Sequence, residues 1–449
     1  MTSSKPRPSY SAESRSATAP ASVPAPTPPS APTAPACAST FTSDPVSAST
    51  STSTPASASA SASASASASE ETMSAKTRVA VTLGEHVRRQ LGRMCGAAGF
   101  TDTSDGSGLP LLDLLDLLGP AAGRPLKAGP PSPSFVCDDH SPVEFSLAFS
   151  AGSPVALRLL VEPGCVATTL EERGRLGRQA LEALAARRGF STEPVRRVED
   201  LFFSPVMDGS FALWCAMDLR PDRPAGIKVY LNPQAHGRER SAHVAEEALS
   251  RFGFGRAWAA LREQAMPRGP DRDRILFFAL DLDGWDTPRV KVYVAHHEIT
   301  AAEAHTVSGL LPGEPAVRVD EFCRVAGGDV VRFAHRPLVS CLSYTERDSM
   351  HPSGYTVHVP VRDYAPDDGV ARDRAVAVLR RYGMDAGVMD SAWAAMTSRR
   401  PSDGVGLIAY LSLVQSSRQP PRVNVYFSPE AYAVRPPRTS DRVQEGRVR

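Results

Sequence analysis

The stretch Val290-Lys-Val-Tyr-Val294 decides the fold, because an almost identical stretch, Ile227-Lys-Val-Tyr-Leu231, lies 63 residues before it. Each stretch alternates apolar and polar residues with the two-residue period of a β-strand. Three further stretches follow the same pattern: Ala156-Leu-Arg-Leu-Leu160, Tyr355-Thr-Val-His-Val359 and Val423-Asn-Val-Tyr-Phe427. Equivalent positions are 63 to 70 residues apart, so the chain contains five copies of one unit.

Each of these five stretches is predicted to be the second strand of a β-hairpin. A strand-like run precedes each one, and turn-forming residues separate the two. The expected first strands are Val143–Ser150, Phe211–Leu219, Ile275–Leu282, Val339–Thr345 and Val405–Val414. Amphipathic helices are expected before and between the hairpins, at Val79–Gly96, Leu109–Leu118, Leu170–Arg188, Arg240–Ala265, Thr300–Leu311, Gly369–Tyr382 and Val388–Ser398.

Ten antiparallel strands with helical connections favour one fold class. Closure of the strands into a barrel removes the edges that an open sheet would expose. Because helices occur only in the connections, they are expected to surround the barrel. The predicted fold is therefore an α+β barrel of five ααββ repeats, which occupies residues 77-435 as a single domain.

The two ends of the chain differ from this domain in composition. Ser, Ala, Thr and Pro dominate residues 1-76, and Ala56–Ser69 is a strict alternation of Ala and Ser. Such a segment has too little bulky apolar surface to offset the entropy that is lost on ordering. We expect residues 1-76 to be a disordered, low-complexity tail and residues 436-449 to be a flexible C-terminal tail.

Composition and charge exclude several classes of function. The formal net charge is +1, from 50 basic and 49 acidic residues, which gives no general attraction for nucleic acid. The chain has no apolar run of about 18 residues and no N-terminal secretory signal, so neither a membrane span nor export is expected. Its seven cysteines lack a CxxC pair, which is typical of reduced thiols. The expected location is the cytoplasm, and the expected state is a monomer or homodimer.

Strand alternation predicts which side chains of the second strands share a face. Lys228 and Tyr230 lie on one face, and Lys291 and Tyr293 lie on the equivalent face of the next repeat. The residues between them are valines, and this apolar face must pack against the helices. The polar face therefore points into the barrel, where cations and tyrosines are expected to form a binding chamber.

The cations of this chamber predict an anionic ligand. Buried positive charges are costly unless an anion neutralises them. A diphosphate is the favoured ligand, because it can accept hydrogen bonds from both guanidinium and ammonium groups. The predicted diphosphate-binding residues are Arg158, Lys228, Arg289 and Lys291.

Tyrosines beside these cations predict that the ligand also develops positive charge. The π face of a tyrosine stabilises an organic cation. A diphosphate site next to such rings can ionise an allylic diphosphate and protect the resulting carbocation. The expected carbocation shield consists of Tyr230, Tyr293, Tyr410 and Tyr426.

No metal or other cofactor is expected for this chemistry. A magnesium ion that bridges to a diphosphate would need paired carboxylates such as DDxxD. The two Asp-Asp pairs, Asp138-Asp139 and Asp367-Asp368, do not continue into that pattern. We therefore predict no metal ligands, and we expect the protein's own cations to neutralise the diphosphate.

Two other polar strings are interpreted as structural. His296-His297-Glu298 has no third ligand at a suitable spacing, so we interpret it as a solvated turn. Asp281, Asp283 and Asp286 are interpreted as loop residues, because their spacing does not fit a calcium-binding loop.

In combination, these residues resemble the dimethylallyltryptophan synthase family of aromatic, indole-modifying prenyltransferases. The resemblance extends in order from about residue 80 to residue 435. It is particularly clear with tryptophan prenyltransferases of actinobacteria, several of which act at carbon 6. The motifs that carry it are Asp138-Asp-His-Ser-Pro-Val-Glu144-Phe-Ser, Arg158, Lys228-Val-Tyr230, Arg289-Val-Lys291-Val-Tyr293, Val359-Pro-Val-Arg-Asp-Tyr364 and Val425-Tyr426.

The resemblance implies the family's ABBA-type barrel, an aromatic acceptor that is usually an indole, and a metal-independent reaction. From its strand position alone, Glu144 has two equally weighted interpretations: a structural one, as a solvated residue or an ion-pair partner of Arg158, and a functional one. The resemblance implies instead that Glu144 is the catalytic carboxylate, which accepts the indole N–H and makes the ring more reactive. It also implies the diphosphate and shield roles given above, and it makes Arg274 the arginine that holds the amino-acid carboxylate.

Departures from the family pattern concern substrate binding and the final proton transfer. Fungal members would have Gln and Tyr where this chain has Thr356 and His358, so these two are candidate substrate-binding residues with a different shape. The family's lysine that could accept the ring proton has only Arg220 as a loose counterpart, and arginine is a poor base. The base is therefore open between Glu144 and water.

The leading hypothesis is an enzyme of secondary metabolism that transfers a dimethylallyl group from dimethylallyl diphosphate to carbon 6 of L-tryptophan. Its substrates are small molecules, and neither a nucleic-acid nor a membrane partner is expected. Two alternatives remain open. One is the same chemistry on tyrosine or on an indole-containing cyclic dipeptide, and the other is a non-catalytic barrel that binds a small anionic ligand.

Overall fold

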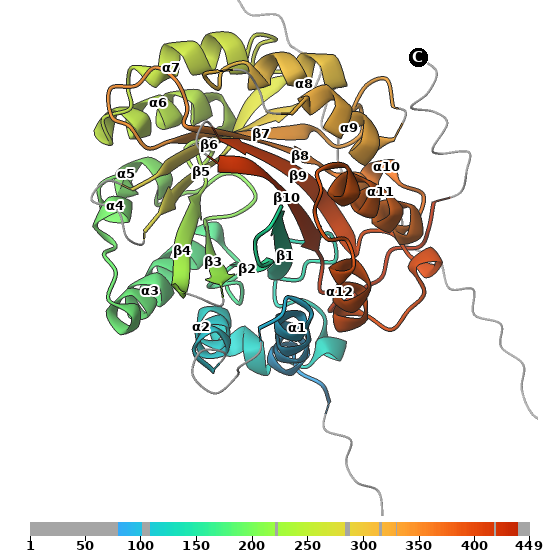
Figure 1. Cartoon of the computed structure of the whole chain (residues 1–449). Coiled ribbons are helices and arrows are strands. Elements are labelled where there is room, and N and C mark those ends of the chain that lie inside the picture. Colours follow the sequence, from blue (N-terminus) through green and yellow to red (C-terminus); the bar gives the residue numbers. More distant parts are fainter. Residues whose placement is uncertain are drawn as a thin grey trace, which may run out of the picture. The chain divides into compact units, whose positions relative to one another are not determined.

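Figure 1 shows the computed structural model of the chain, in which ten strands close into a barrel with helices on its outer side. The structure describes residues 80-100, 108-220, 223-282, 288-313, 317-328, 330-416 and 419-438. The expected N-terminal tail lies outside these ranges. The expected C-terminal tail overlaps them by three residues, and Arg438 donates a hydrogen bond to Asp363 over 3.2 Å.

The barrel closes because each strand pairs with two antiparallel neighbours. The strand order is β1-β10-β9-β8-β7-β6-β5-β4-β3-β2, after which β2 returns to β1. The strands are β1 (Val143–Ser150), β2 (Ala156–Val161), β3 (Leu213–Arg220), β4 (Arg223–Leu231), β5 (Asp273–Asp281), β6 (Val290–His296), β7 (Leu338–Tyr344), β8 (Gly354–Val359), β9 (Ile408–Ser416) and β10 (Gln419–Phe427). The predicted fold class is confirmed.

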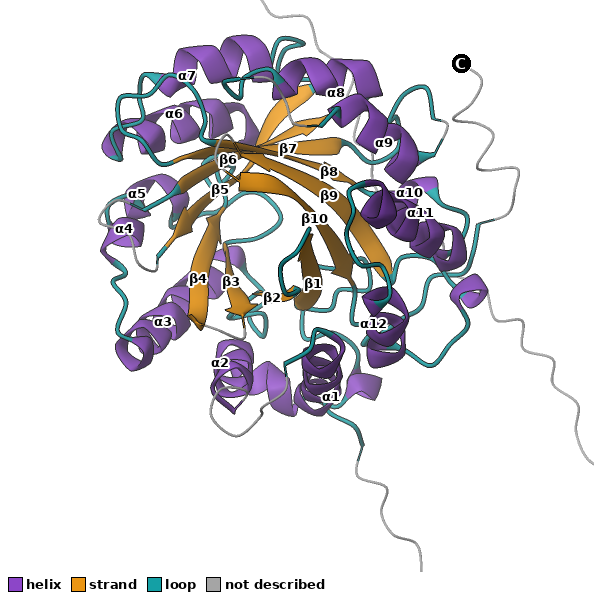
Figure 2. Cartoon of the chain, in the orientation of Figure 1, coloured by secondary structure: helices purple, strands orange, loops and turns teal. Residues whose placement is uncertain are grey.

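Helices form the outer layer that covers the barrel, as Figure 2 shows. The α-helices are α1 (Leu83–Ala97), α2 (Gly108–Leu118), α3 (Leu170–Arg188), α4 (Glu193–Arg196), α5 (Glu199–Phe202), α6 (Ser241–Arg251), α7 (Ala257–Ala260), α8 (Ala301–Ser308), α9 (Val319–Gly327), α10 (Val361–Tyr364), α11 (Asp368–Arg381) and α12 (Val388–Met396). Short 3₁₀ or π segments are η1 (Gly119–Gly123), η2 (Leu126–Ala128), η3 (Arg238–Arg240), η4 (Leu261–Ala265) and η5 (Pro401–Asp403). Within the described ranges, none of the helices has the length and apolar character needed to cross a bilayer.

The core lies between the barrel and its helices. The outward-facing valines of the second strands, such as Val229, Val292 and Val425, are fully buried there. This burial is the main reason why the alternating stretches hold one register, since a shift by one residue would exchange the two faces. Gln90 of α1 donates to the carbonyls of Met396 and Pro429, both over 2.9 Å, and so ties the first helix to the last repeat.

The helical connections differ in detail from the expected ones. The expected helix Arg240–Ala265 is interrupted after α6, where Gly253 has a φ of +82°. Glycine adopts this left-handed conformation without the Cβ clash of other residues, so it ends the helix. A further helix, α9, covers a segment for which no helix was expected, because its apolar pattern extends over only nine residues.

Candidate active site

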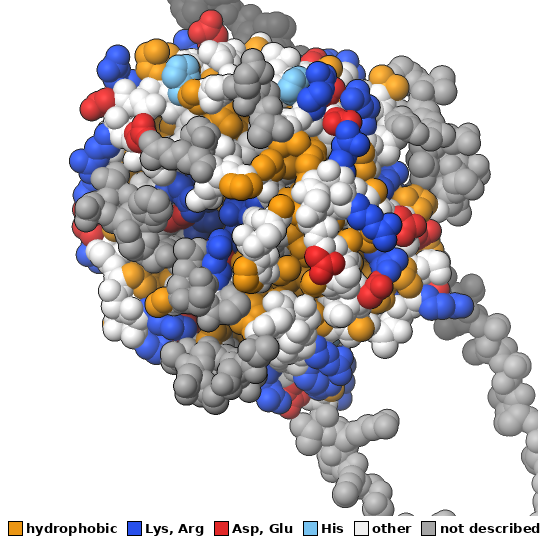
Figure 3. Space-filling view, viewed as in Figure 1, with side chains coloured by type: hydrophobic (Ala, Val, Ile, Leu, Met, Phe, Trp, Pro, Cys, Tyr) orange, Lys and Arg blue, Asp and Glu red, His pale blue; other side chains and the backbone are white. Residues whose placement is uncertain are grey.

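The inner face of the barrel has two ends of different character. Odd-numbered strands begin, and even-numbered strands end, at the same mouth, because all neighbouring strands are antiparallel. At this mouth, which we call the Glu144 end, the inner face carries Glu144, Trp214, Arg274, Val339 and Tyr410. At the opposite mouth, the cationic end, it carries Arg158, Asp218, Arg220, Lys228, Asp281, Arg289, Lys291 and Arg422. In Figure 3, basic side chains line part of the hollow to the left of the centre.

Asp281, the last residue of β5, is the centre of one group of cations. Its Oδ1 atom lies 3.7 Å from Nζ of Lys228 and 3.8 Å from Nζ of Lys291, and Nε of Arg289 donates to its Oδ2 over 2.7 Å. Burial opposes the charge of Asp281, but these cations outweigh it and hold the pKa of the carboxyl well below its usual range. Burial lowers the pKa of Lys291 below its ordinary value, and the charge of Asp281 opposes that shift.

Asp218 of β3 is the centre of a second group. Its carboxylate lies 3.4 Å from Nη2 of Arg158 and 3.5 Å from Nε of Arg220. Burial opposes the charge of Asp218, but Arg158 and its other cationic neighbours lower the pKa to about 2. Burial and the charge of Arg158 lower the pKa of Arg422, on β10, to about 9. Six cations therefore share two carboxylates at this end, which leaves a positive excess for an anionic ligand.

The four predicted diphosphate-binding residues are brought together, but their carboxylate partners were not foreseen. Asp281 was expected to be a loop residue, and this interpretation is wrong, because Asp281 closes β5 and is buried. Asp283 and Asp286 lie outside the described residues. Alternation along the last strand predicts that Arg422 shares the inner face with Asn424 and Tyr426, and Asp218 alternates onto the inner face of β3, so the same rule could have found it.

Aromatic rings extend from the middle of the barrel to the Glu144 end. The rings of Tyr230 and Tyr293 lie 5.6 Å apart between centroids, and the Tyr293 hydroxyl lies 3.5 Å from that of Tyr230. Tyr426 lies 6.3 Å from Tyr410 on the neighbouring strand. Nζ of Lys228 is 5.9 Å from the Tyr230 centroid, so the rings begin where the cations end. All four predicted shield tyrosines are therefore on the inner face.

Three more aromatic residues extend this region towards the Glu144 end. Trp214 stacks on Phe211 at 4.2 Å, and Phe277 lies 5.2 Å from Trp214 and 5.7 Å from Tyr293. The Trp214 indole N–H is buried and has no hydrogen-bond partner among the described residues. These residues were missed, because only the second strands of the hairpins were used to assign the inner face.

Glu144 lies at the Glu144 end and is almost fully buried, with 8% of its surface exposed. Burial raises the pKa of its carboxyl to about 8, and Arg362 opposes that shift. No ion pair with Arg158 forms within the described structure, because Arg158 contacts Asp218 and Asn424 instead. Glu144 is therefore a buried acid beside an aromatic cavity, where a polar N–H group could hydrogen-bond to it.

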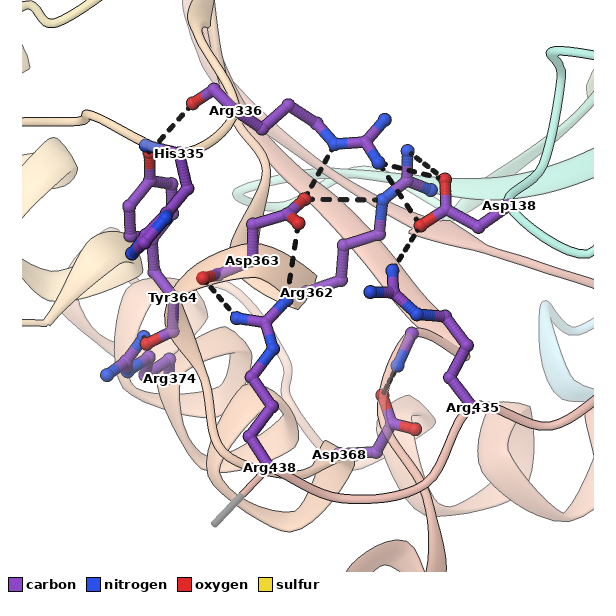
Figure 4. A network of polar contacts seen from close by, with 11 residues as sticks. Asp138, His335, Arg336, Arg362, Asp363, Tyr364, Asp368, Arg374, Arg435 and Arg438 are labelled. Carbon is purple, nitrogen blue, oxygen red and sulfur yellow. Dashed lines mark hydrogen bonds and ion pairs between the residues drawn. The ribbon is translucent and has the colours of Figure 1, made fainter. Parts of the chain in front are cut away.

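A network of arginines and aspartates connects several segments at this mouth of the barrel (Figure 4). Asp138 pairs with Arg336, Arg362 and Arg435, and Asp363 pairs with Arg336, Arg362 and Arg438. The network connects the segments before β1 and β7 with those after β8 and β10. Arg362 lies with its guanidinium 4.8 Å from the centroid of Tyr410 and pulls the pKa of Glu144 downward. Asp138 of the same network acts in the opposite direction, so the network contributes both signs of charge to the environment of Glu144.

Arg274 also lies at the Glu144 end, where its guanidinium donates to Nε2 of His297. Burial, Arg274 and two further arginines lower the pKa of His297 to about 4, so its ring stays neutral. The expected solvated turn at His296-His297-Glu298 is wrong for His296, which is 1% exposed and lies 2.8 Å from Asp273 through Nδ1. The isolated motif gave no sign that β6 continues to this residue.

Stability should depend on pH through Glu144. Its folded pKa of about 8 exceeds the ordinary value of 4.5, so the protonated form stabilises the fold below pH 4.5 and this contribution is lost as pH rises through 8. Glu144→Gln is expected to be more stable than the wild type above pH 8, by at most about 5 kcal/mol, and equal to it near pH 4.5. Denaturant unfolding across this range, with exposed Glu182→Gln as the control, measures the difference. A difference that does not change with pH would contradict the buried position of Glu144.

The described residues include no cluster of three His, Cys, Asp or Glu side chains that could hold a metal ion. Six of the seven cysteines lie in the described ranges, and all six are buried free thiols. At the cationic end, the positively charged side chains that could contact an anionic ligand are those of Arg158, Arg220, Lys228, Arg289, Lys291 and Arg422.

Comparison with known proteins identifies relatives with this barrel. The family model for tryptophan dimethylallyltransferase matches residues 84-311. The prenyltransferase PriB, solved with L-tryptophan and dimethylallyl thiolodiphosphate, is 48% identical, covers 80% of this chain and 99% of its own, and has a TM-score of 0.75. The 5-dimethylallyltryptophan synthase of Streptomyces coelicolor is 45% identical, with coverage of 79% and 100% and a TM-score of 0.73.

A third relative, the 6-dimethylallyltryptophan synthase of Micromonospora olivasterospora, is 42% identical, with coverage of 80% and 100% and a TM-score of 0.74. These three similarities extend over nearly the whole length of each relative. They cover the ten-stranded barrel and the helices around it. The resemblance seen in the sequence motifs is confirmed, and the chain belongs to the tryptophan dimethylallyltransferase family.

Proposed function

We propose that this protein transfers a dimethylallyl group from dimethylallyl diphosphate to carbon 6 of L-tryptophan, without a metal, in secondary metabolism. The observation that carries the proposal is the division of the barrel interior into a cationic end and a Glu144 end with aromatic rings between them. This order matches the needs of the reaction: an anion at one end, a carbocation in the middle and an indole at the other.

The donor would bind at the cationic end. Arg158, Lys228, Arg289 and Lys291 would hold its diphosphate, and the last three are already paired with the carboxylate of Asp281. Heterolysis of the allylic C–O bond places its electron pair on the diphosphate. Preorganised cations stabilise that developing charge, which is commonly the largest single contribution to catalysis.

The allylic cation would form among the tyrosines. Tyr230, Tyr293, Tyr410 and Tyr426 present rings that attract a cation and exclude water, which would otherwise capture it. Trp214 and Phe277 extend this apolar wall towards the acceptor.

The acceptor would bind at the Glu144 end. Glu144 would accept the hydrogen bond of the indole N–H, and Arg274 would hold the amino-acid carboxylate. Thr356 and His358 line the wall between these positions and contribute to substrate binding. Placing the ring carbon against the cation decides which carbon reacts, because a well-oriented pair reacts as an intramolecular one.

Turnover is expected to be unchanged in EDTA, since the six cations of the cationic end supply the neutralisation that magnesium would otherwise provide. Initial rates with and without chelator, and with added magnesium, measure this. Loss of nearly all turnover in EDTA that magnesium restores would contradict the metal-free mechanism.

One incubation tests the proposed function itself. Purified protein, dimethylallyl diphosphate and L-tryptophan are expected to give one monoprenylated tryptophan by mass spectrometry, with NMR placing the group at carbon 6. Prenylation of another ring carbon would contradict the regiochemistry. Product only from tyrosine or an indole-containing cyclic dipeptide would change the acceptor, and binding without product would indicate a non-catalytic barrel.

A further inference from the structure

His358 of β8 is a neutral histidine on the inner face of the barrel. Its ring lies 6.0 Å from that of Tyr293 and 5.8 Å from that of Tyr426, between centroids. It therefore stands among the rings that would surround the allylic cation, and on the far side of Tyr426 from β1, which carries Glu144. The proposed reaction assigns no proton acceptor at this place.

The hydrogen bonds of His358 fix its tautomer. Nδ1 lies 3.2 Å from the backbone carbonyl oxygen of Val339. A carbonyl oxygen only accepts hydrogen bonds, so Nδ1 carries the hydrogen and Nε2 keeps its lone pair. Burial, together with the positive charges of Lys291, Lys228 and Arg158, lowers the pKa of the imidazole to about 4 and keeps it uncharged. An oriented neutral imidazole is the form in which histidine acts as a general base.

Other side chains near the rings are poorer acceptors. Burial raises the pKa of Tyr426 to about 12 and raises that of Tyr293, so both hydroxyls keep their protons. Lys228 and Lys291 are within 4 Å of Asp281 and would face the diphosphate. Glu144 would already hold the indole N–H, and carbon 6 is three bonds away from that nitrogen. A carboxylate that is held by the N–H is not placed to take the hydrogen of carbon 6 as well.

We propose that Nε2 of His358 accepts the proton that the acceptor carbon loses when the prenylated ring regains aromaticity; this inference rests on the proposed function. The allylic C–O bond breaks with its pair on the diphosphate, and an indole π pair forms the new C–C bond. The ring C–H bond then breaks, its pair restores the aromatic ring, and its proton binds Nε2. The imidazolium passes the proton to an oxygen of the diphosphate.

Donor binding would favour this transfer. Lys291, Lys228 and Arg158 are the cations whose charges oppose protonation of His358, and they are also the cations that would hold the diphosphate. A diphosphate bound to them offsets that opposition, so the imidazole becomes a better base when the reaction needs one.

Kinetics with tryptophan deuterated on its benzene ring test the role. His358→Asn keeps a donor for the Val339 carbonyl but lacks the Nε2 lone pair. It should lower kcat by about 10²-fold, and a deuterium isotope effect absent from the wild type should appear, because C–H cleavage becomes slow. Affinity for dimethylallyl thiolodiphosphate should stay unchanged, because the cations that would hold the diphosphate are untouched. Free imidazole should restore turnover to His358→Ala. Exposed His243→Ala, on α6, is the histidine control.

The outcomes separate this inference from the proposed function. Wild-type turnover without an isotope effect in His358→Asn overturns the base assignment, and so does a loss of donor affinity with no isotope effect. In both cases the wild type still makes prenyltryptophan, so the proposed function stands. Absence of any prenyltryptophan from the wild type overturns both.

Discussion

Glu144→Gln is expected to lower the rate of prenyl transfer by about 10²- to 10⁴-fold while it changes donor affinity little. Glutamine keeps the shape of the side chain and a hydrogen-bond acceptor, but it cannot ionise. The ionised carboxylate, which forms as pH rises through about 8, is the form that polarises the indole N–H. Because that charge acts on the ring as it attacks, its loss should appear in the chemical step. Single-turnover rates with saturating substrates measure it directly.

The control for this variant is Glu182→Gln, which changes an exposed glutamate on α3. It should leave both rate and affinity unchanged. If Glu144→Gln retains full turnover with tryptophan, the indole does not bind against Glu144, and the acceptor geometry given above is wrong.

Lys291→Ala is expected to weaken donor binding and to slow ionisation together. Loss of one charge-assisted hydrogen bond to the diphosphate costs about 1.5–3 kcal/mol, or roughly tenfold to a hundredfold in affinity. The same contact stabilises the leaving diphosphate, so kcat should also fall. The variant also leaves Asp281 with fewer cations, since Nζ of Lys291 is 3.8 Å from it.

Exposed Lys127→Ala, in the short helix η2, is the matched control and should behave as the wild type. Equilibrium binding of dimethylallyl thiolodiphosphate and steady-state kinetics with the donor varied separate the two effects. Unchanged donor affinity in Lys291→Ala would mean that the diphosphate binds elsewhere in the barrel.

The barrel and the lysines of its cationic end could be predicted from the sequence, because both follow from alternation in a repeated strand. Lys228 and Lys291 recur one repeat apart with valines between polar residues. A one-residue shift would bury the lysines against helices, so the inner face could be assigned without coordinates. In the structure, Lys228 pairs with Asp281 and Lys291 pairs with Ala279, and this register agrees with the assigned inner face.

Simple alternation could not predict the inner face of every strand. A register shift between Ile275 and Phe277 breaks the two-residue period of β5. Counted back strictly from Asp281, Arg274 would face outward, whereas the shift pairs it with Ala295 on the inner face. Arg274 was therefore found through resemblance to a family and not through spacing.

Contacts between distant segments also could not be predicted from the sequence. Asp138 pairs with Arg336, Arg362 and Arg435, which are about 200 to 300 residues further along the chain. No local pattern distinguishes these arginines from the many others in the chain. Only closure of the barrel brings the four segments to one mouth, and with it the charges that act on Glu144.

The most direct test of the divided barrel is a pair of binding titrations, each with one ligand alone. Dimethylallyl thiolodiphosphate and L-tryptophan are titrated separately by calorimetry into the wild type, Lys291→Ala and Glu144→Gln. The account predicts that Lys291→Ala loses affinity for the thiolodiphosphate but not for tryptophan, and that Glu144→Gln keeps its affinity for the thiolodiphosphate. Equal loss of both ligands in Lys291→Ala, or loss of thiolodiphosphate binding in Glu144→Gln, would contradict separate donor and acceptor ends.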